Sequence, residues 1–161
     1  MSAEVTLTGD EMTVCLKLAV IKFESDRALN YKDTYFTPDT EELKFKYQLL
    51  AIASEMAAAK WLGVPDFVPQ LNTFKNEPDI FPDWEVKHSL NPEYLTIRPT
   101  DRDSDRAIFV TGENPFIIEG WLPVKYCKDD SYAYDGYEKP CWRVPRAELV
   151  KVLPNESSAK A

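Results

Sequence analysis

Apolar residues recur with a helical period in the first half of the chain. Between about residues 9 and 29 they follow three- and four-residue steps, which predicts an amphipathic helix. The predicted packing stripe consists of Met12, Leu16, Ala19, Val20 and Phe23. A second helix is predicted over about 39–62, and it ends before Gly63 and Pro65. The first half is therefore expected to supply two consecutive helices.

Both predicted helices have recognisable starts. Thr8-Gly-Asp-Glu11 has the capping-box pattern, in which a hydroxyl and a glutamate satisfy each other's backbone amides. Pro38-Asp39-Thr40-Glu41-Glu42 places acidic residues in the first turn of the second helix, where they suit the helix dipole. Residues 1–7 are expected to form a frayed lead-in, and 30–38 a polar connection.

The pattern changes after residue 63, where eleven of the twelve prolines lie and short β-rich runs replace the helical period. A loop and a short strand are predicted within Val64–Thr73. Further strands are predicted at Trp84–Ser89, Tyr94–Arg98, Ala107–Thr111 and Phe116–Leu122. The predicted fold class is α+β or α/β. A mixed central sheet, from about 64–122, would be covered on one face by the two helices.

The last part of the chain is rich in aromatic and charged residues. Residues 125–142 are interpreted as a long loop packed against the sheet, or as a surface that stacks on bases. Residues 144–149 are expected to form a closing turn or short helix, and 154–161 a disordered tail. One domain, 1–153, is therefore expected, since 161 residues are enough to bury a core without staples.

Composition limits the cellular setting and the class of chemistry. Cys15, Cys127 and Cys141 are odd in number and lack metal-site spacing, so free thiols in a reducing cytoplasm are expected. The chain shows no apolar run of membrane-spanning length and no signal-peptide pattern, so no membrane partner is expected. His88 is the only histidine and falls on the apolar side of its strand, which argues against a hydroxyl-nucleophile triad. The five glycines form no phosphate-binding loop.

The net charge of −8 is unevenly distributed. Residues 1–85 carry 8 basic and 15 acidic side chains, whereas 86–161 carry 11 and 12. This balance counts against a nucleic-acid partner unless bound divalent cations and a local basic patch provide the positive charge. The candidate substrate-binding cations are Arg98, Lys125 and Arg143.

Three carboxylates and a lysine gather where a strand is predicted to begin, within Pro78–Lys87. Strand alternation places Asp83, Glu85 and Lys87 on one face, opposite Trp84, Val86 and His88. The charged face is interpreted either as a solvated edge or as a metal site. The later run Asp101–Arg106 is interpreted as a solvated turn, because it lacks the glycine and the final glutamate of an EF-hand loop.

Glu55 is a charged residue within an apolar helical stripe. Its neighbours at three and four residues on either side are Ala51, Ile52, Ala58 and Ala59. An unpaired charge in such a stripe would cost several kcal/mol, so a metal, a lysine or a proton is expected to compensate it. The alternatives are a structural salt bridge, a glutamate that snorkels at the edge of the stripe, and a functional acid that faces the sheet.

These residues resemble the PD-(D/E)XK, or restriction-endonuclease-like, nuclease superfamily. The resemblance consists of Pro78-Asp79, the E-x-K element Glu85-Val86-Lys87, and an upstream helix that bears Glu55. The later runs 95–98, 107–110 and 118–121 also look like small phage-encoded members. The resemblance implies that Asp79 and Glu85 hold Mg²⁺ or Mn²⁺, that Lys87 orients the attacking water, and that Glu55 joins the site.

The implied chemistry has an independent rationale. Phosphodiester hydrolysis needs charge stabilisation and a nucleophilic water, and a divalent cation held by carboxylates supplies both. Lys87 lies about 7 Å along the strand from Glu85, which places its ammonium beside such a cation. Only five residues separate Asp79 from Glu85, so Asp83 is the alternative metal ligand.

Two main function classes follow from this reading, and a small structural protein, which would assemble at higher concentration without a ligand, is a third. The first is a metal-dependent DNA nuclease, which by resemblance would often pair as a homodimer, in the host cytoplasm if phage-encoded. The second is a non-catalytic phage accessory or inhibitor protein on the same fold, whose acidic half binds a basic surface of a host protein.

Overall fold

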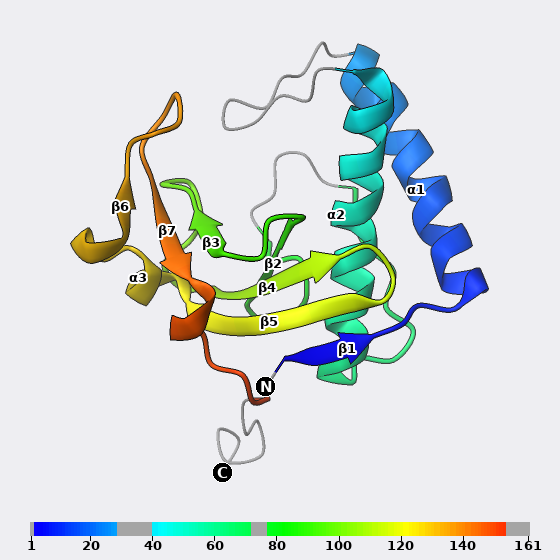
Figure 1. The fold of residues 1–161 in the computed structure, drawn as a ribbon. Coiled ribbons are helices and arrows are strands. Elements are labelled where there is room, and N and C mark those ends of the chain that lie inside the picture. The colour runs from blue at the N-terminus through cyan, green and yellow to red at the C-terminus, as the bar shows by residue number, and fades with distance from the viewer. Residues whose placement is uncertain (1, 29–39, 72–76, 154–161) are drawn as a thin grey trace.

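Three layers make up the structure, a computed structural model that describes residues 2–28, 40–71 and 77–153. Figure 1 shows two long helices on one side of the central strands and a small second sheet on the other side. The predicted connection at 30–38 and the predicted tail at 154–161 lie outside the described residues.

The two helices begin and end where the sequence signals predict. Helix α1 spans Gly9–Ala28, and at its start the N–H of Thr8 donates to Glu11 Oε1 at 2.8 Å while the N–H of Glu11 donates to Thr8 Oγ1 at 3.1 Å. Helix α2 spans Glu41–Leu62 and is capped by the Thr40 side chain. It ends at Gly63, whose φ of 76° suits a residue without a Cβ. Both predicted helices are confirmed.

The buried face of α1 differs from the predicted stripe. Cys15, Ala19 and Asp26 are buried, whereas Leu16 and Val20 are 46% and 47% exposed. The reason is a close approach of the two helices, since the Cys15 Sγ lies 3.8 Å from the Met56 Sδ of α2. Small residues permit this approach, so they occupy the interface in place of the larger apolar side chains.

The central sheet has four strands in the order β1-β5-β4-β2. The strands span Ala3–Val5 (β1), Trp84–Ser89 (β2), Arg106–Gly112 (β4) and Phe116–Pro123 (β5). The β2–β4 pair is parallel and the β1–β5 and β4–β5 pairs are antiparallel, which confirms the α+β class and the mixed sheet.

The predicted frayed lead-in at residues 1–7 is wrong. Ala3–Val5 pairs with β5, and both Val5 and Leu7 are buried in the core between sheet and helices. Two apolar side chains and an available β5 edge are enough to order this short segment.

A second, three-stranded sheet was not anticipated. Its order is β3-β7-β6, with β3 at Tyr94–Ile97, β7 at Cys141–Pro145 and β6 at Ala133–Tyr134. The prediction that Tyr94–Arg98 joins the central sheet is therefore wrong. The cause is the pairing of Leu95 with Val144, an apolar pair that lies far apart in the sequence.

The segment 125–142 is more regular than the long loop that was expected. It contains most of a short helix α3, Val124–Cys127, then a 3₁₀ turn at Asp130–Tyr132, β6 and the start of β7. A second 3₁₀ turn at Arg146–Glu148 agrees with the predicted closing element. Residues 64–71 include no strand, because Pro65 and Pro69 withhold backbone donors there.

Strand β4 is buried on both faces. Ile108 and Val110 lie in the core shared with the helices, whereas Ala107 and Phe109 lie in the core shared with the second sheet. The continuous apolar run of this strand follows from its place in the middle layer. Charged residues of β2, the neighbouring strand, are thereby held at an edge of the central sheet.

Candidate functional site

A tight hairpin brings Asp79 beside β2. The backbone groups of Ile80 and Trp84 exchange two hydrogen bonds, at 3.0 and 2.9 Å, and both side chains are buried. The three intervening residues form the turn. The chain therefore doubles back at once, so Asp79 returns to the level of Glu85 despite the short spacing.

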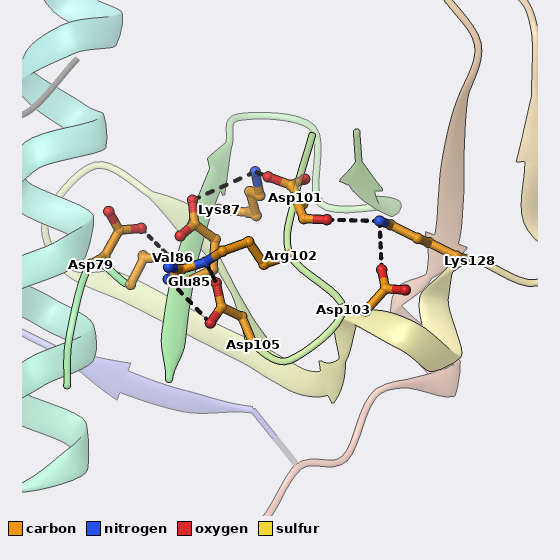
Figure 2. A network of polar contacts seen from close by, with 9 residues as sticks. All are labelled: Asp79, Glu85, Val86, Lys87, Asp101, Arg102, Asp103, Asp105 and Lys128. Atoms are coloured by element: carbon orange, nitrogen blue, oxygen red, sulfur yellow. Dashed lines mark hydrogen bonds and ion pairs between the residues drawn. The ribbon is translucent and has the colours of Figure 1, made fainter. Parts of the chain in front are cut away.

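The Asp79 carboxylate lies against the outer edge of β2. Its Oδ2 accepts the N–H of Val86 at 2.7 Å, immediately after Glu85 in the strand (Figure 2). On its other side, Asp79 lines an open cavity of about 290 Å³ whose apolar wall includes Phe67 and Phe81. Asp79 therefore both lines this cavity and binds the backbone of β2.

Glu85 and Lys87 project from the same face of β2, as the alternation predicts. The Lys87 Nζ lies 3.9 Å from the Glu85 Oε1, and the two side chains are 19% and 16% exposed. Trp84 and Val86 pack on the opposite, helix-facing side. The predicted division of this strand into a charged face and an apolar face is confirmed.

Asp101 joins this charged face from the loop after β3. Its Oδ1 lies 2.7 Å from the Lys87 Nζ, and its Oδ2 accepts the N–H of Arg98 at 2.7 Å. The Asp101 carbonyl accepts from the Lys128 Nζ at 2.7 Å (Figure 2). With its side chain only 10% exposed, Asp101 fixes the position of the lysine ammonium.

The prediction of a solvated turn at Asp101–Arg106 is wrong for two of its acids. Asp101 faces Lys87, and Asp105 is buried and paired with Arg102 at 3.0 Å. Asp103 fits the prediction, since its side chain is 69% exposed and pairs with Lys128. The turn folds onto the charged face of β2, and each buried carboxylate is satisfied by a basic partner.

The resulting network has an excess of negative charge. Figure 2 draws five carboxylates and three cations: Asp79, Glu85, Asp101, Asp103 and Asp105, with Lys87, Arg102 and Lys128. Asp101, Arg102 and Lys128 were missed as site residues. The available signal was the alternation of acid and base over 101–106, which favours internal ion pairs over a solvated acidic loop.

Asp83, the alternative metal ligand, is committed to another contact. Both of its carboxylate oxygens accept from Arg106, with distances of 2.6 to 3.0 Å. The Arg106 guanidinium also lies 3.8 Å from the centre of the Trp84 ring. This pair joins the start of β4 to the hairpin and engages both oxygens of Asp83, and the choice of Asp79 as the ligand stays a prediction.

Glu55 lies in the helical layer. It is half-buried on α2, near Cys15 of α1. Burial, and secondarily the charges of Glu11 and Glu55, raise the pKa of Cys15 to about 11. Ala51, one of the expected apolar neighbours, is exposed. The grouping of Glu55 with Glu85 and Lys87 stays a prediction from the resemblance.

A divalent cation can be held by a cage of protein side chains, or by a few carboxylates together with waters and substrate oxygens. Among the described residues, no three histidine, cysteine, aspartate or glutamate side chains converge as a metal cage. Mg²⁺ commonly binds through one or two carboxylates, with waters and substrate phosphates as its other ligands. Asp79, which accepts the Val86 N–H, and Glu85 of β2 are the two carboxylates that the sequence predicts for such a site.

The three predicted substrate-binding cations lie in two parts of the structure, with Arg98 and Arg143 in the second sheet region and Lys125 on α3. Arg98 follows β3 and Arg143 lies on β7, and both act on the Cys141 thiol. Burial raises the pKa of Cys141, while the two guanidinium charges oppose that shift. Lys125 lies on α3, beside the ring of Tyr126.

His88 occupies a structural position at the end of β2. Its Nε2 lies 2.8 Å from the Gly112 carbonyl, and its ring packs edge-on against Phe116. Burial lowers the pKa of His88 below its ordinary value, more strongly than the Gly112 contact raises it. This placement agrees with the prediction of a core or edge histidine.

The structure thus defines an α+β protein with a mixed sheet and a charged cluster on an edge strand. No family model matches the chain, and comparisons with curated proteins and with solved structures also find no match. None of the helices in the described ranges is long and apolar enough to cross a membrane.

Proposed function

We propose that the protein is a divalent-metal-dependent nuclease that hydrolyses DNA phosphodiester bonds. The observation that carries this proposal is that one edge strand holds Lys87 within 3.9 Å of Glu85, while its Val86 N–H binds the Asp79 carboxylate. Two carboxylates and one ammonium at this spacing suit the hydrolysis of an anionic substrate that brings further oxygen ligands. The resemblance to PD-(D/E)XK nucleases supports the same assignment.

Each residue has a distinct part in the proposed reaction. A bound Mg²⁺ or Mn²⁺ would stabilise charge on the phosphoryl oxygens and make a water molecule more acidic. Asp79 and Glu85 would hold the cation, with Asp79 kept in place by the Val86 N–H. Lys87 would orient the water or neutralise developing charge, and Asp101 would position Lys87 through their 2.7 Å ion pair.

Cleavage assays on purified variants test this proposal. Supercoiled plasmid and a single-stranded oligonucleotide are incubated with Mg²⁺, Mn²⁺ or EDTA. Wild-type protein is expected to cleave only with metal, and Glu85→Gln or Lys87→Met to lose at least about a hundredfold in rate.

Asp103→Asn is the matched control, since it removes a charge from the same network at a side chain that is 69% exposed. This variant is expected to cleave like the wild type. Circular dichroism would check that all variants fold. Metal-dependent cleavage that survives both Glu85→Gln and Lys87→Met would overturn the assignment.

A second candidate is a non-catalytic accessory or inhibitor protein that binds a basic surface of a host protein. The pairing of Asp83, Asp101 and Asp105 with cations inside the chain favours its non-catalytic character, because paired carboxylates are less available to a metal ion. This candidate predicts no metal-dependent cleavage. It also predicts that Glu85→Gln leaves the metal response of the protein unchanged.

A further inference from the structure

The outer face of the three-stranded sheet holds an arginine between two tyrosine rings. Arg143 lies on β7, the middle strand, with Tyr94 on β3 and Tyr134 on β6. The guanidinium carbon is 4.0 Å from the centre of the Tyr94 ring and 4.2 Å from that of Tyr134. The neighbouring residue Val144 points into the core instead.

Tyr94 and Tyr134, which form an aromatic clamp on Arg143, have supporting contacts on the Tyr134 side. The Tyr134 ring packs edge-on against Tyr137, with centroids 5.1 Å apart. Gly136 lies so close to the Tyr134 hydroxyl that any side chain at position 136 would collide with it. Tyr134 is therefore held from both sides, by Arg143 and by the 136–137 turn.

Arg143 differs from two other half-buried cations, Lys87 and Arg106. Lys87 and Arg106 each contact a carboxylate. In the described part of the chain, Arg143 makes its contacts with tyrosine rings, and its buried Nε has no hydrogen-bond partner. This is unusual in a chain of net charge −8, since acidic partners are abundant.

The geometry restricts what such an arginine can bind. Both tyrosine rings contact the guanidinium and its Nε is buried, so the terminal N–H donors are the groups that a ligand would meet. That fork matches the oxygens of a phosphate or carboxylate. Arg98 adds positive charge on the same side, since both guanidinium groups act on the Cys141 thiol. Aromatic rings beside an arginine also suit the bases of a single strand.

We propose that Arg143, clamped by Tyr94 and Tyr134, binds a phosphate group of single-stranded DNA. The choice of DNA as the source of the phosphate rests on the proposed nuclease function. The site would hold the strand through its backbone, with a base against the Tyr94 ring, and would give an acidic protein the local positive contact that DNA binding requires.

Fluorescence anisotropy with a labelled oligothymidine in EDTA tests binding without cleavage. Arg143→Gln is expected to weaken binding at least about tenfold. Arg143→Lys is expected to be intermediate, because it keeps the charge but loses the planar fork. Arg27→Gln is the matched control, since it removes an exposed arginine that lies over a single ring, Phe23, on α1. This control is expected to bind like the wild type.

Three results would overturn the inference. If wild type, Arg143→Lys and Arg143→Gln all bind the oligonucleotide equally, Arg143 is not part of a binding site. If Arg27→Gln weakens binding as much as Arg143→Gln does, the effect comes from net charge and not from the Arg143 site. Arg143-dependent binding of inorganic phosphate without binding of the oligonucleotide would exclude DNA as the source.

The same samples separate this inference from the proposed function. Arg143-dependent binding without metal-dependent cleavage would leave the binding site in place and reject the nuclease. Metal-dependent cleavage together with binding that does not depend on Arg143 would support the nuclease and reject the Arg143 site.

Discussion

At the residue scale, the position of the Lys87 ammonium is set by two neighbouring carboxylates. Its ammonium lies 2.7 Å from Asp101 and 3.9 Å from Glu85, with most of the side chain covered. The Asp101 carboxylate is the closer of the two, so it holds the lysine ammonium more firmly than Glu85 does. In the proposed reaction, Asp101 is therefore a positioning residue and Glu85 a ligand.

His88 gives a pH-dependent prediction. Burial lowers its pKa in the folded protein below the ordinary value of 6.5, so the unfolded chain binds the proton more readily. The free energy of unfolding should therefore rise with pH through the window just below 6.5 and level off above it. Since His88 is the only histidine, NMR titration of its ring proton reports the pKa directly.

His88→Gln is the control for that prediction, because glutamine retains an N–H donor for Gly112 but does not titrate. Urea unfolding of this variant is expected to lack the histidine part of the pH dependence. A measured pKa at or above 6.5 in the folded protein would contradict the account.

Some of these residue positions were predictable and others were not. Period-two alternation was enough to place Glu85 and Lys87 opposite Trp84. Nothing local could place Asp101 against Lys87, because that contact depends on how the loop after β3 returns over β2. The clamp around Arg143 joins three strands, so the aromatic content alone could only suggest it.

At the element scale, β5 changes direction at a bulge opposite β4. Phe109 pairs with Gly120 but the next residue, Val110, pairs with Ile118, which leaves Glu119 as the extra residue. The parity of the strand shifts there. Ile118 and Trp121 both reach the helix-side core, whereas Leu122 packs toward the second sheet.

Gly120, the glycine of β5, should be sensitive to substitution. Its φ is +146°, and a Cβ there would lie 2.6 Å from the Leu149 Cβ and 2.8 Å from the Val150 carbonyl oxygen. Gly120→Ala is expected to lower the free energy of unfolding by about 3 kcal/mol, measured by urea denaturation.

Gly9→Ala is the matched glycine control. No atom lies within 4 Å of a Cβ built at Gly9, which begins α1, so its effect should stay within about 0.5 kcal/mol. A Gly120→Ala protein as stable as the wild type would contradict the bulge geometry.

The elements with local signals were predicted best. The capping box at Thr8 and the glycine at position 63 mark real helix ends. The strand β1 and the second sheet depend on partners far along the chain, such as Ala3 with Ile118 and Leu95 with Val144. Local pattern cannot contain that information, which is why both were missed.

At the scale of the whole molecule, the middle sheet separates two environments. Its helix-facing side is an apolar core, and its other side carries the charged cluster of β2 and the second sheet. The proposed cation site and the Arg143 clamp belong to different sheets, β2 of one and β7 of the other. In the proposed function, one region would hold the strand and the other would cleave it.

The most direct test of the cation site is calorimetric titration of Mn²⁺ into metal-free protein. Wild type and Asp103→Asn are expected to show the same saturable binding, because Asp103 is an exposed member of the network. Asp79→Asn and Glu85→Gln are expected to lose it, since each removes one of the two proposed ligands. Saturable binding that persists in both ligand variants, or its absence from the wild type, would contradict the account.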